Sequence, residues 1–129
     1  MKWTPNRVLL GVICALVILL LSAGPAAAYA KSATIYHGRD KAYARNYYSS
    51  IDRSYVAYIS VCDNEWDGNT VYAKVRLYGS DYAYRVVDRD GWGGACATRS
   101  FISAQIRDFK LCEEDNGCTS WAILSPAWY

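Results

Sequence analysis

The stretch CDNEWDGNTVYAK, residues 62–74, contains the residue types and spacing of a metal-binding loop. Asp63, Glu65 and Asp67 occupy alternate positions, and a glycine follows them directly. An EF-hand calcium loop places oxygen ligands at positions 1, 3, 5, 7, 9 and 12, with a glycine at position 6. The stretch matches positions 1, 3, 5 and 6, but Lys74 stands at position 12, where the loop needs a bidentate glutamate.

The residues that flank this acidic stretch are typical of β-strands, whereas an EF-hand loop is flanked by helices. We therefore interpret the stretch as a hairpin turn with solvated carboxylates, and we predict no metal ion and no other cofactor. Weak calcium binding at Asp63, Glu65 and Asp67 is the alternative.

Catalytic combinations of side chains are missing from the sequence. His37 is the sole histidine, and no serine, cysteine or aspartate motif accompanies it. A pair of carboxylates acting as acid and base needs one raised pKa, for which a solvated surface turn offers no cause. We predict that the protein is not an enzyme.

Aromatic residues provide the stronger functional signal. In TVYAKVRLYG, residues 70–79, alternation places Tyr72, Lys74, Arg76 and Tyr78 on one face of a strand. Amphipathic rings suit contacts with proteins or sugars. We predict a binding face made of these four residues, together with the loop residues Trp66 and Trp92. The expected partner is an extracellular protein or an envelope glycan.

The N-terminus is typical of an export signal. Lys2 and Arg7 precede an uncharged apolar run at residues 8–21, which is shorter than the roughly 20 residues of a membrane-spanning helix. Cleavage is expected after Ala28 or Ala30, which makes residues 1–30 a signal peptide and the protein secreted. Contact with a membrane would then be limited to this transient segment. Residues 31–129 carry equal numbers of basic and acidic side chains, which argues against a nucleic-acid partner.

Cysteine usage agrees with an oxidising compartment. Beyond the signal peptide the cysteines are Cys62, Cys96, Cys112 and Cys118. Their even number, the absence of a C-x-x-C pair and the single histidine favour disulfides over zinc. Cys112 and Cys118 enclose the turn-rich stretch EEDNG, so we pair them with each other and Cys62 with Cys96.

The remaining sequence indicates an all-β domain. Residues 31–52 form a polar, Tyr-rich segment without a clean period, which we expect to be a loosely ordered lead-in. Residues 53–129 contain about six strand-like stretches at regular spacing, separated by turn signals. That pattern predicts an antiparallel sandwich or a small barrel.

The patterns VCDNEWDG, VYAKVRL and FKLCEEDNGCTSW resemble those of a group of small exported actinobacterial proteins. The similarity covers residues 55–121. It implies an Ig-like β-sandwich with two disulfides and an uncharacterised role, and it transfers no catalytic residue. We therefore expect an exported, non-catalytic binding protein. The alternative is a small secreted effector, such as a protease inhibitor or an antibacterial factor, acting through the loop EEDNG or DGWGGA.

Overall fold

The computed structural model describes residues 31–128, in which all regular elements are β-strands. The predicted signal peptide, residues 1–30, lies outside the described residues. Within residues 31–128, none of the elements is a helix with the length and hydropathy that crossing a membrane requires.

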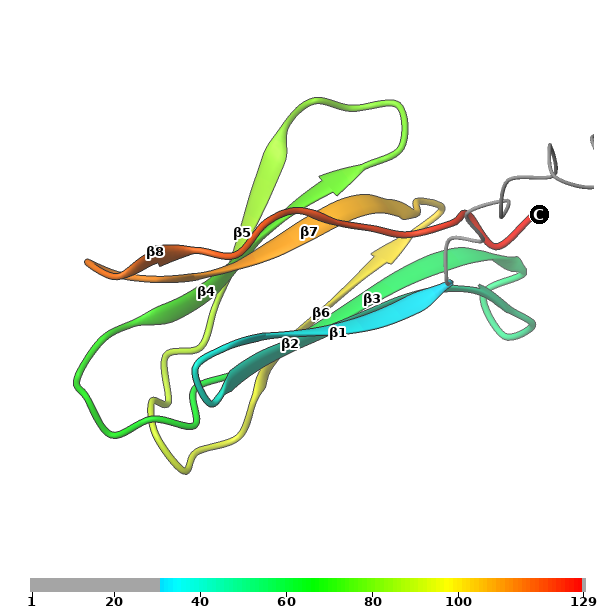
Figure 1. Ribbon diagram of the computed structural model, residues 1–129. Coiled ribbons are helices and arrows are strands. Elements are labelled where there is room, and N and C mark those ends of the chain that lie inside the picture. The colour runs from blue at the N-terminus through cyan, green and yellow to red at the C-terminus, as the bar shows by residue number, and fades with distance from the viewer. Residues whose placement is uncertain (1–30, 129) are drawn as a thin grey trace, which may run out of the picture.

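The strands form two antiparallel sheets packed face to face (Figure 1). The four-stranded sheet has the order β1 (Ser32–His37), β2 (Asp40–Ser49), β3 (Ser54–Cys62) and β6 (Ala97–Ile102). The five-stranded sheet has the order β5 (Ala83–Val87), β4 (Val71–Leu77), β7 (Ile106–Glu113) and β8 (Gly117–Cys118), and β9 (Ala122–Ile123) also pairs with β7. The predicted all-β antiparallel sandwich is confirmed.

Alternating side chains build the core between the sheets. On β4, Val71, Ala73, Val75 and Leu77 are buried, and the residues between them are half-buried on the outer face, as the alternation predicts. The largest fully buried apolar side chains are Phe109, Ile59, Ile106, Leu111 and Leu124. Burying each such side chain contributes roughly 1.5–3 kcal/mol to the free energy of unfolding.

The segment 31–52 departs from its prediction. The expected lead-in is instead a paired hairpin, β1–β2, at the edge of the four-stranded sheet, and β2 runs along β3 over its whole length. On β2 the inward positions hold Ala42, Ala44 and Asn46, which are small or polar. Because these residues are small or polar and the outward-facing tyrosines are larger, the sequence of β2 does not show the alternation of apolar and polar residues that indicates a strand. The sandwich domain therefore begins at Ser32 and not at residue 53.

Asn46 links the two sheets through its side-chain amide. Its Oδ1 accepts a hydrogen bond from the backbone N–H of Ile106 at 2.8 Å. Its Nδ2 donates to the backbone carbonyls of Ile106 at 2.8 Å and Ser125 at 3.0 Å. The amide thus pairs with both backbone groups of Ile106 much as a neighbouring strand would, across the interior of the sandwich.

Both predicted disulfides are confirmed. Cys62, the last residue of β3, is bonded to Cys96, directly before β6. Cys112 of β7 is bonded to Cys118 of β8, its partner in the register of that hairpin. Each bond therefore fastens neighbouring strands of one sheet. Two intramolecular disulfides fit an oxidising environment.

Candidate functional site

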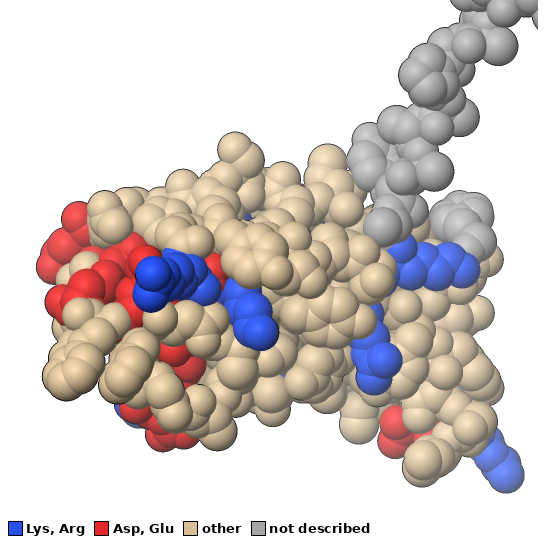
Figure 2. All heavy atoms as spheres, turned by 60° about the horizontal axis from the view of Figure 1, so that its bottom comes forward, with Lys and Arg blue, Asp and Glu red and all other residues tan. Residues whose placement is uncertain are grey.

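One end of the sandwich collects most of the carboxylates, and we call it the acidic end (Figure 2). The β1–β2 turn, the β3–β4 loop (63–70), the β5–β6 loop (88–96) and the β7–β8 turn all lie there, because antiparallel pairing brings these strand ends together. Its acidic residues are Asp40, Asp63, Glu65, Asp67, Asp88, Asp90, Glu113, Glu114 and Asp115.

The β3–β4 loop does not form the predicted hairpin turn. β3 pairs with β2 and β6, whereas β4 pairs with β5 and β7, so residues 63–70 cross from one sheet to the other. A strand with a partner on each side has no free edge for its successor. The loop therefore runs over the open end of the sandwich and carries its side chains there.

Trp66 and Trp92 meet at the acidic end. Trp66 comes from the β3–β4 loop and is 83% exposed, and Trp92 comes from the β5–β6 loop and is 55% exposed. Their ring centroids are 5.0 Å apart with an interplanar angle of 23°, which is a stacked pair. Both rings line a hollow of about 500 Å³, whose other walls include Asp63, Asp88 and Arg89.

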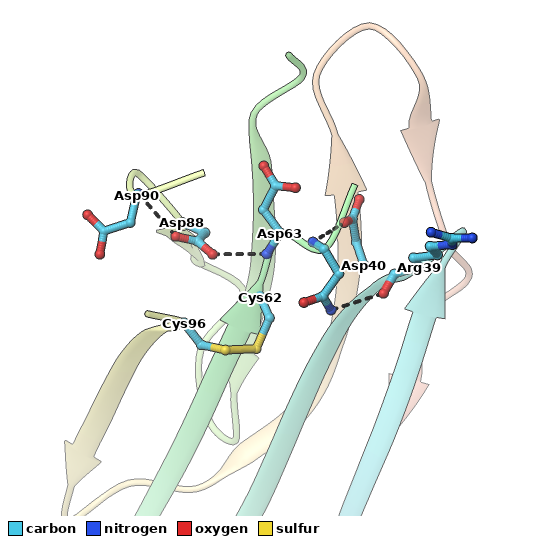
Figure 3. The surroundings of a disulfide bond; sticks show 8 residues. Arg39, Asp40, Cys62, Asp63, Asp88, Asp90 and Cys96 are labelled. Carbon is cyan, nitrogen blue, oxygen red and sulfur yellow. Dashed lines mark hydrogen bonds between the residues drawn. A yellow bond between two sulfur atoms is a disulfide. The ribbon is translucent and has the colours of Figure 1, made fainter. Parts of the chain in front are cut away.

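The two tryptophan loops are fastened to each other by Asp88. One carboxylate oxygen of Asp88 accepts from the backbone N–H of Asp63 at 2.9 Å, and the other accepts from the N–H of Asp90 at 3.2 Å (Figure 3). The Cys62–Cys96 disulfide lies next to these contacts. The loop positions are therefore set by a covalent bond and by hydrogen bonds to a carboxylate, which are stronger than neutral ones.

Asp40 holds the other side of the β3–β4 loop. Its Oδ1 accepts from the backbone N–H of Asn64 at 2.7 Å, and the Asn64 side chain donates to the carbonyl of Arg39 at 3.0 Å (Figure 3). Asp40 is completely buried. Burial raises the pKa of its carboxyl, the carboxylates of Asp63 and Glu65 raise it further, and the bond from Asn64 opposes them.

Asp63 and Asp67 each accept a hydrogen bond from within the β3–β4 loop. The Oδ1 of Asp63 accepts from the N–H of Glu65 at 3.1 Å, and the Oδ1 of Asp67 accepts from the N–H of Asn69 at 2.9 Å, which lowers the pKa of Asp67. Both carboxylates close local turns of the loop. The expectation of three solvated carboxylates is wrong for Asp63, which is 7% exposed and whose pKa is raised by burial.

Glu65 belongs to a different group of acids. Carboxylate oxygens of Glu65, Asp40 and Glu113 all lie within 4.8 Å of one another. Glu113, the last residue of β7, is buried beside His37, whose Nδ1 is 3.1 Å from its Oε2. His37, the sole histidine of the sequence, is thus half-buried against this acid.

The predicted tyrosine face lies on the outside of the five-stranded sheet. Tyr72, Lys74 and Arg76 share the outer side of β4, where the guanidinium of Arg85 lies 3.7 Å from the centroid of the Tyr72 ring. Tyr78 lies beyond a register shift between Arg76 and Leu77, and its hydroxyl donates to the carbonyl of Leu124 at 2.6 Å. Trp66 and Trp92, which were predicted with this face, lie instead at the acidic end.

Comparison with protein families, with curated proteins and with solved structures finds no match to this chain. The resemblance to small exported actinobacterial proteins stays a prediction. The functional argument therefore depends on the geometry of the chain itself.

Several residues of the acidic end were missed at the level of sequence. Asp40 and Glu113 each occupy an inward-facing position at the end of a strand, in line with the buried residues of that strand. This periodicity is the signal that could have identified them as buried acids. Asp88 continues the inward positions of β5 in the same way. Burying a carboxylate at a strand end lowers the stability of the fold unless the carboxylate has partners. Such positions are therefore candidates for binding sites.

Proposed function

We propose that the protein is an exported, non-catalytic binding module that recognises basic side chains of an extracellular protein partner at its acidic end. The observation that carries the proposal is the exposed Trp66–Trp92 stack beside a hollow with carboxylate walls. Export is supported by the signal-like N-terminus and by the two disulfides.

The chemistry of this surface suits a cation. Indole rings attract ammonium and guanidinium groups through the negative potential of their faces, and nearby carboxylates add a charge-assisted interaction. Asp63 and Asp88 face the hollow with a single cation, Arg89, among its lining residues. The outer faces of a stacked pair stay available to a ligand. A lysine or arginine side chain therefore matches the surface in charge.

Replacing both Trp66 and Trp92 by alanine is expected to weaken binding of a hexa-arginine peptide about tenfold, because a cation–π contact with an exposed ring contributes about 0.5–1 kcal/mol. Titration followed by tryptophan fluorescence and by calorimetry measures the dissociation constants. Trp128→Ala is the matched control, since Trp128 is 50% exposed in the C-terminal segment, away from the acidic end. Binding that the double variant retains in full would count against the proposal.

A second candidate function rests on a row of cations on the five-stranded sheet. Lys74 is directly opposite Arg85 on one neighbouring strand and Lys110 on the other. Like charges in opposite positions destabilise a sheet. Arg85 has an exposed partner, Glu114, at 3.6 Å, but among residues 31–128 no carboxylate reaches Lys74 or Lys110. An anionic envelope glycan would neutralise the row.

The double substitution Lys74→Gln and Lys110→Gln is expected to lower retention on immobilised dextran sulfate and co-sedimentation with cell-wall material by several-fold. It should also slightly raise the melting temperature, because it relieves the repulsion. Lys41→Gln with Arg45→Gln, on the outside of the four-stranded sheet, is the control of equal charge. An equal loss in both variants would show nonspecific attraction and exclude the row as a site.

A further inference from the structure

Three carboxylates from distant parts of the chain converge beneath the β3–β4 loop. Asp40 begins β2, Glu65 lies in the loop, and Glu113 ends β7. One oxygen of each lies within 4.8 Å of the others. Asp40 and Glu113 are 0% and 2% exposed, and Glu65 is half-buried. Three acids this close repel one another strongly in an interior of low dielectric constant.

A buried oxygen within this group has no donor. The Oδ1 of Asp40 accepts from Asn64, whereas its Oδ2 is buried and has no hydrogen-bond partner among residues 31–128. The charges that act most on Asp40 are the carboxylates of Asp63, Glu65 and Glu113. Buried carboxylate oxygens nearly always have donors or a metal ion as partners. Asp40 therefore lies among other acids, while His37 contacts the group through Glu113.

We propose that Asp40, Glu65 and Glu113 bind a calcium ion. Carboxylates are hard oxygen ligands, which suit calcium better than the softer transition metals. The four cysteines of residues 31–128 are held in disulfides, so thiolate ligands do not compete. The set differs from the predicted calcium spacing in two of its three acids, because the fold, and not the local sequence, brings these oxygens together.

Neighbouring residues shape the site for these carboxylates. The Oε1 of Glu113 accepts from the Asn69 side chain at 2.7 Å and its Oε2 accepts from that of Asn116 at 2.8 Å. These bonds fix the orientation of the carboxylate. Because the Nδ1 of His37 also lies 3.1 Å from Oε2, it is Oε1 that keeps a second lone pair for an ion. Gly38, at a φ of +60°, lies against Glu65, and a Cβ there would stand 2.5 Å from the Oε2 of Glu65. The turn glycine thus leaves room for the carboxylate.

The inference is independent of the partner proposed for the tryptophan pair. A bound ion would tie the start of β2, the end of β7 and the β3–β4 loop to one point. Because Glu65 directly precedes Trp66, calcium would also restrict the segment that carries that indole ring. The ion would act first on the stability of the acidic end, and this effect can be measured without any partner.

Calcium titration of the full chain, expressed in a host that exports it, tests the site. We expect saturable heat with a dissociation constant of about 0.1–1 mM, the range of extracellular calcium modules. At a tenfold excess over that constant, the melting temperature should rise by about 6–10 °C. The proposal would be overturned if about 10 mM calcium, ten times the upper end of this range, gave no heat and no shift in melting temperature. An equal shift with sodium chloride of the same ionic strength would also overturn it.

Asp40→Asn separates ligation from folding. The asparagine Oδ1 can still accept from Asn64, while one buried negative charge is removed. Without calcium the variant should therefore melt at or above the wild-type temperature, and the rise caused by calcium should be lost. Glu65→Gln, at a half-buried position, should likewise lose the calcium shift. Asp115→Asn, an exposed acid in the β7–β8 turn, is the control and should keep it. If calcium raised the melting temperature of Asp40→Asn as much as that of the wild type, the proposed set of ligands would be refuted.

Discussion

Replacing Asn46 by alanine is expected to lower the free energy of unfolding by about 3–5 kcal/mol. The substitution removes all three hydrogen bonds through which the amide joins β2 to Ile106 and Ser125. It leaves the buried N–H and carbonyl of Ile106 without this partner, and each orphaned buried group costs about 1–3 kcal/mol. A domain of this size has a total stability of about 5–15 kcal/mol, so the variant should approach the limit of folding.

Denaturant unfolding under oxidising conditions measures this loss, with the two disulfides intact in both proteins. Asn64→Ala is the control, because the Asn64 side chain makes one exposed hydrogen bond, to the carbonyl of Arg39. This substitution should lower the free energy of unfolding by less than about 1 kcal/mol. A loss below about 1 kcal/mol for Asn46→Ala would mean that the inter-sheet amide is not a structural link. Asn46→Asp should be at least as damaging, because a carboxylate cannot donate to the two carbonyls.

Strands with large residues in alternation could be predicted from the sequence. β4 shows this best, since apolar and polar side chains alternate along all of Val71–Leu77. The disulfide pairing was also predictable, because Cys112 and Cys118 stand six positions apart around a turn-rich stretch. In both cases the deciding information is local, within the reach of one strand or one turn.

The β1–β2 hairpin and the acidic end were not predictable in the same way. Ala42 and Ala44 are apolar but small, so their alternation with tyrosines gives almost no hydrophobic contrast. The grouping of Asp40 with Glu113 depends on which strands are neighbours at one end of the sandwich, and that is a property of the topology. The D-x-E-x-D spacing brings three acids together in sequence, yet two of them close local turns of the loop.

Opposite charges are separated over the molecule. The acidic end carries the carboxylates and the tryptophan pair, whereas the outer face of the five-stranded sheet carries Lys74, Arg85 and Lys110. A chain whose described part carries equal numbers of basic and acidic side chains can therefore present two surfaces of opposite sign. Under the two functions proposed above, a cationic partner and an anionic surface would occupy different faces of the molecule.

Replacing Cys62 and Cys96 by alanine is expected to lower the free energy of unfolding by about 4 kcal/mol. The bond closes a sequence separation of 34 residues, and the loss follows from the entropy that this constraint removes from the unfolded chain. The Cys112–Cys118 bond closes a separation of 6 residues, so the corresponding alanine pair should lose about 2 kcal/mol. Denaturant unfolding of both double variants measures the difference.

The same substitution should also disturb the tryptophan pair. Cys62 leads into the loop that carries Trp66, and Cys96 ends the loop that carries Trp92, so the disulfide limits the separation of the two rings. Without it the hydrogen bond from the Asp63 N–H to Asp88 still joins the two loops beside the ring contact. We expect the near-ultraviolet circular dichroism of the coupled indoles to fall in the folded Cys62→Ala, Cys96→Ala protein and to persist in the Cys112→Ala, Cys118→Ala control. An unchanged signal in both would show that Asp88 alone fixes the stack, and a loss in both would show that the whole acidic end responds to either bond.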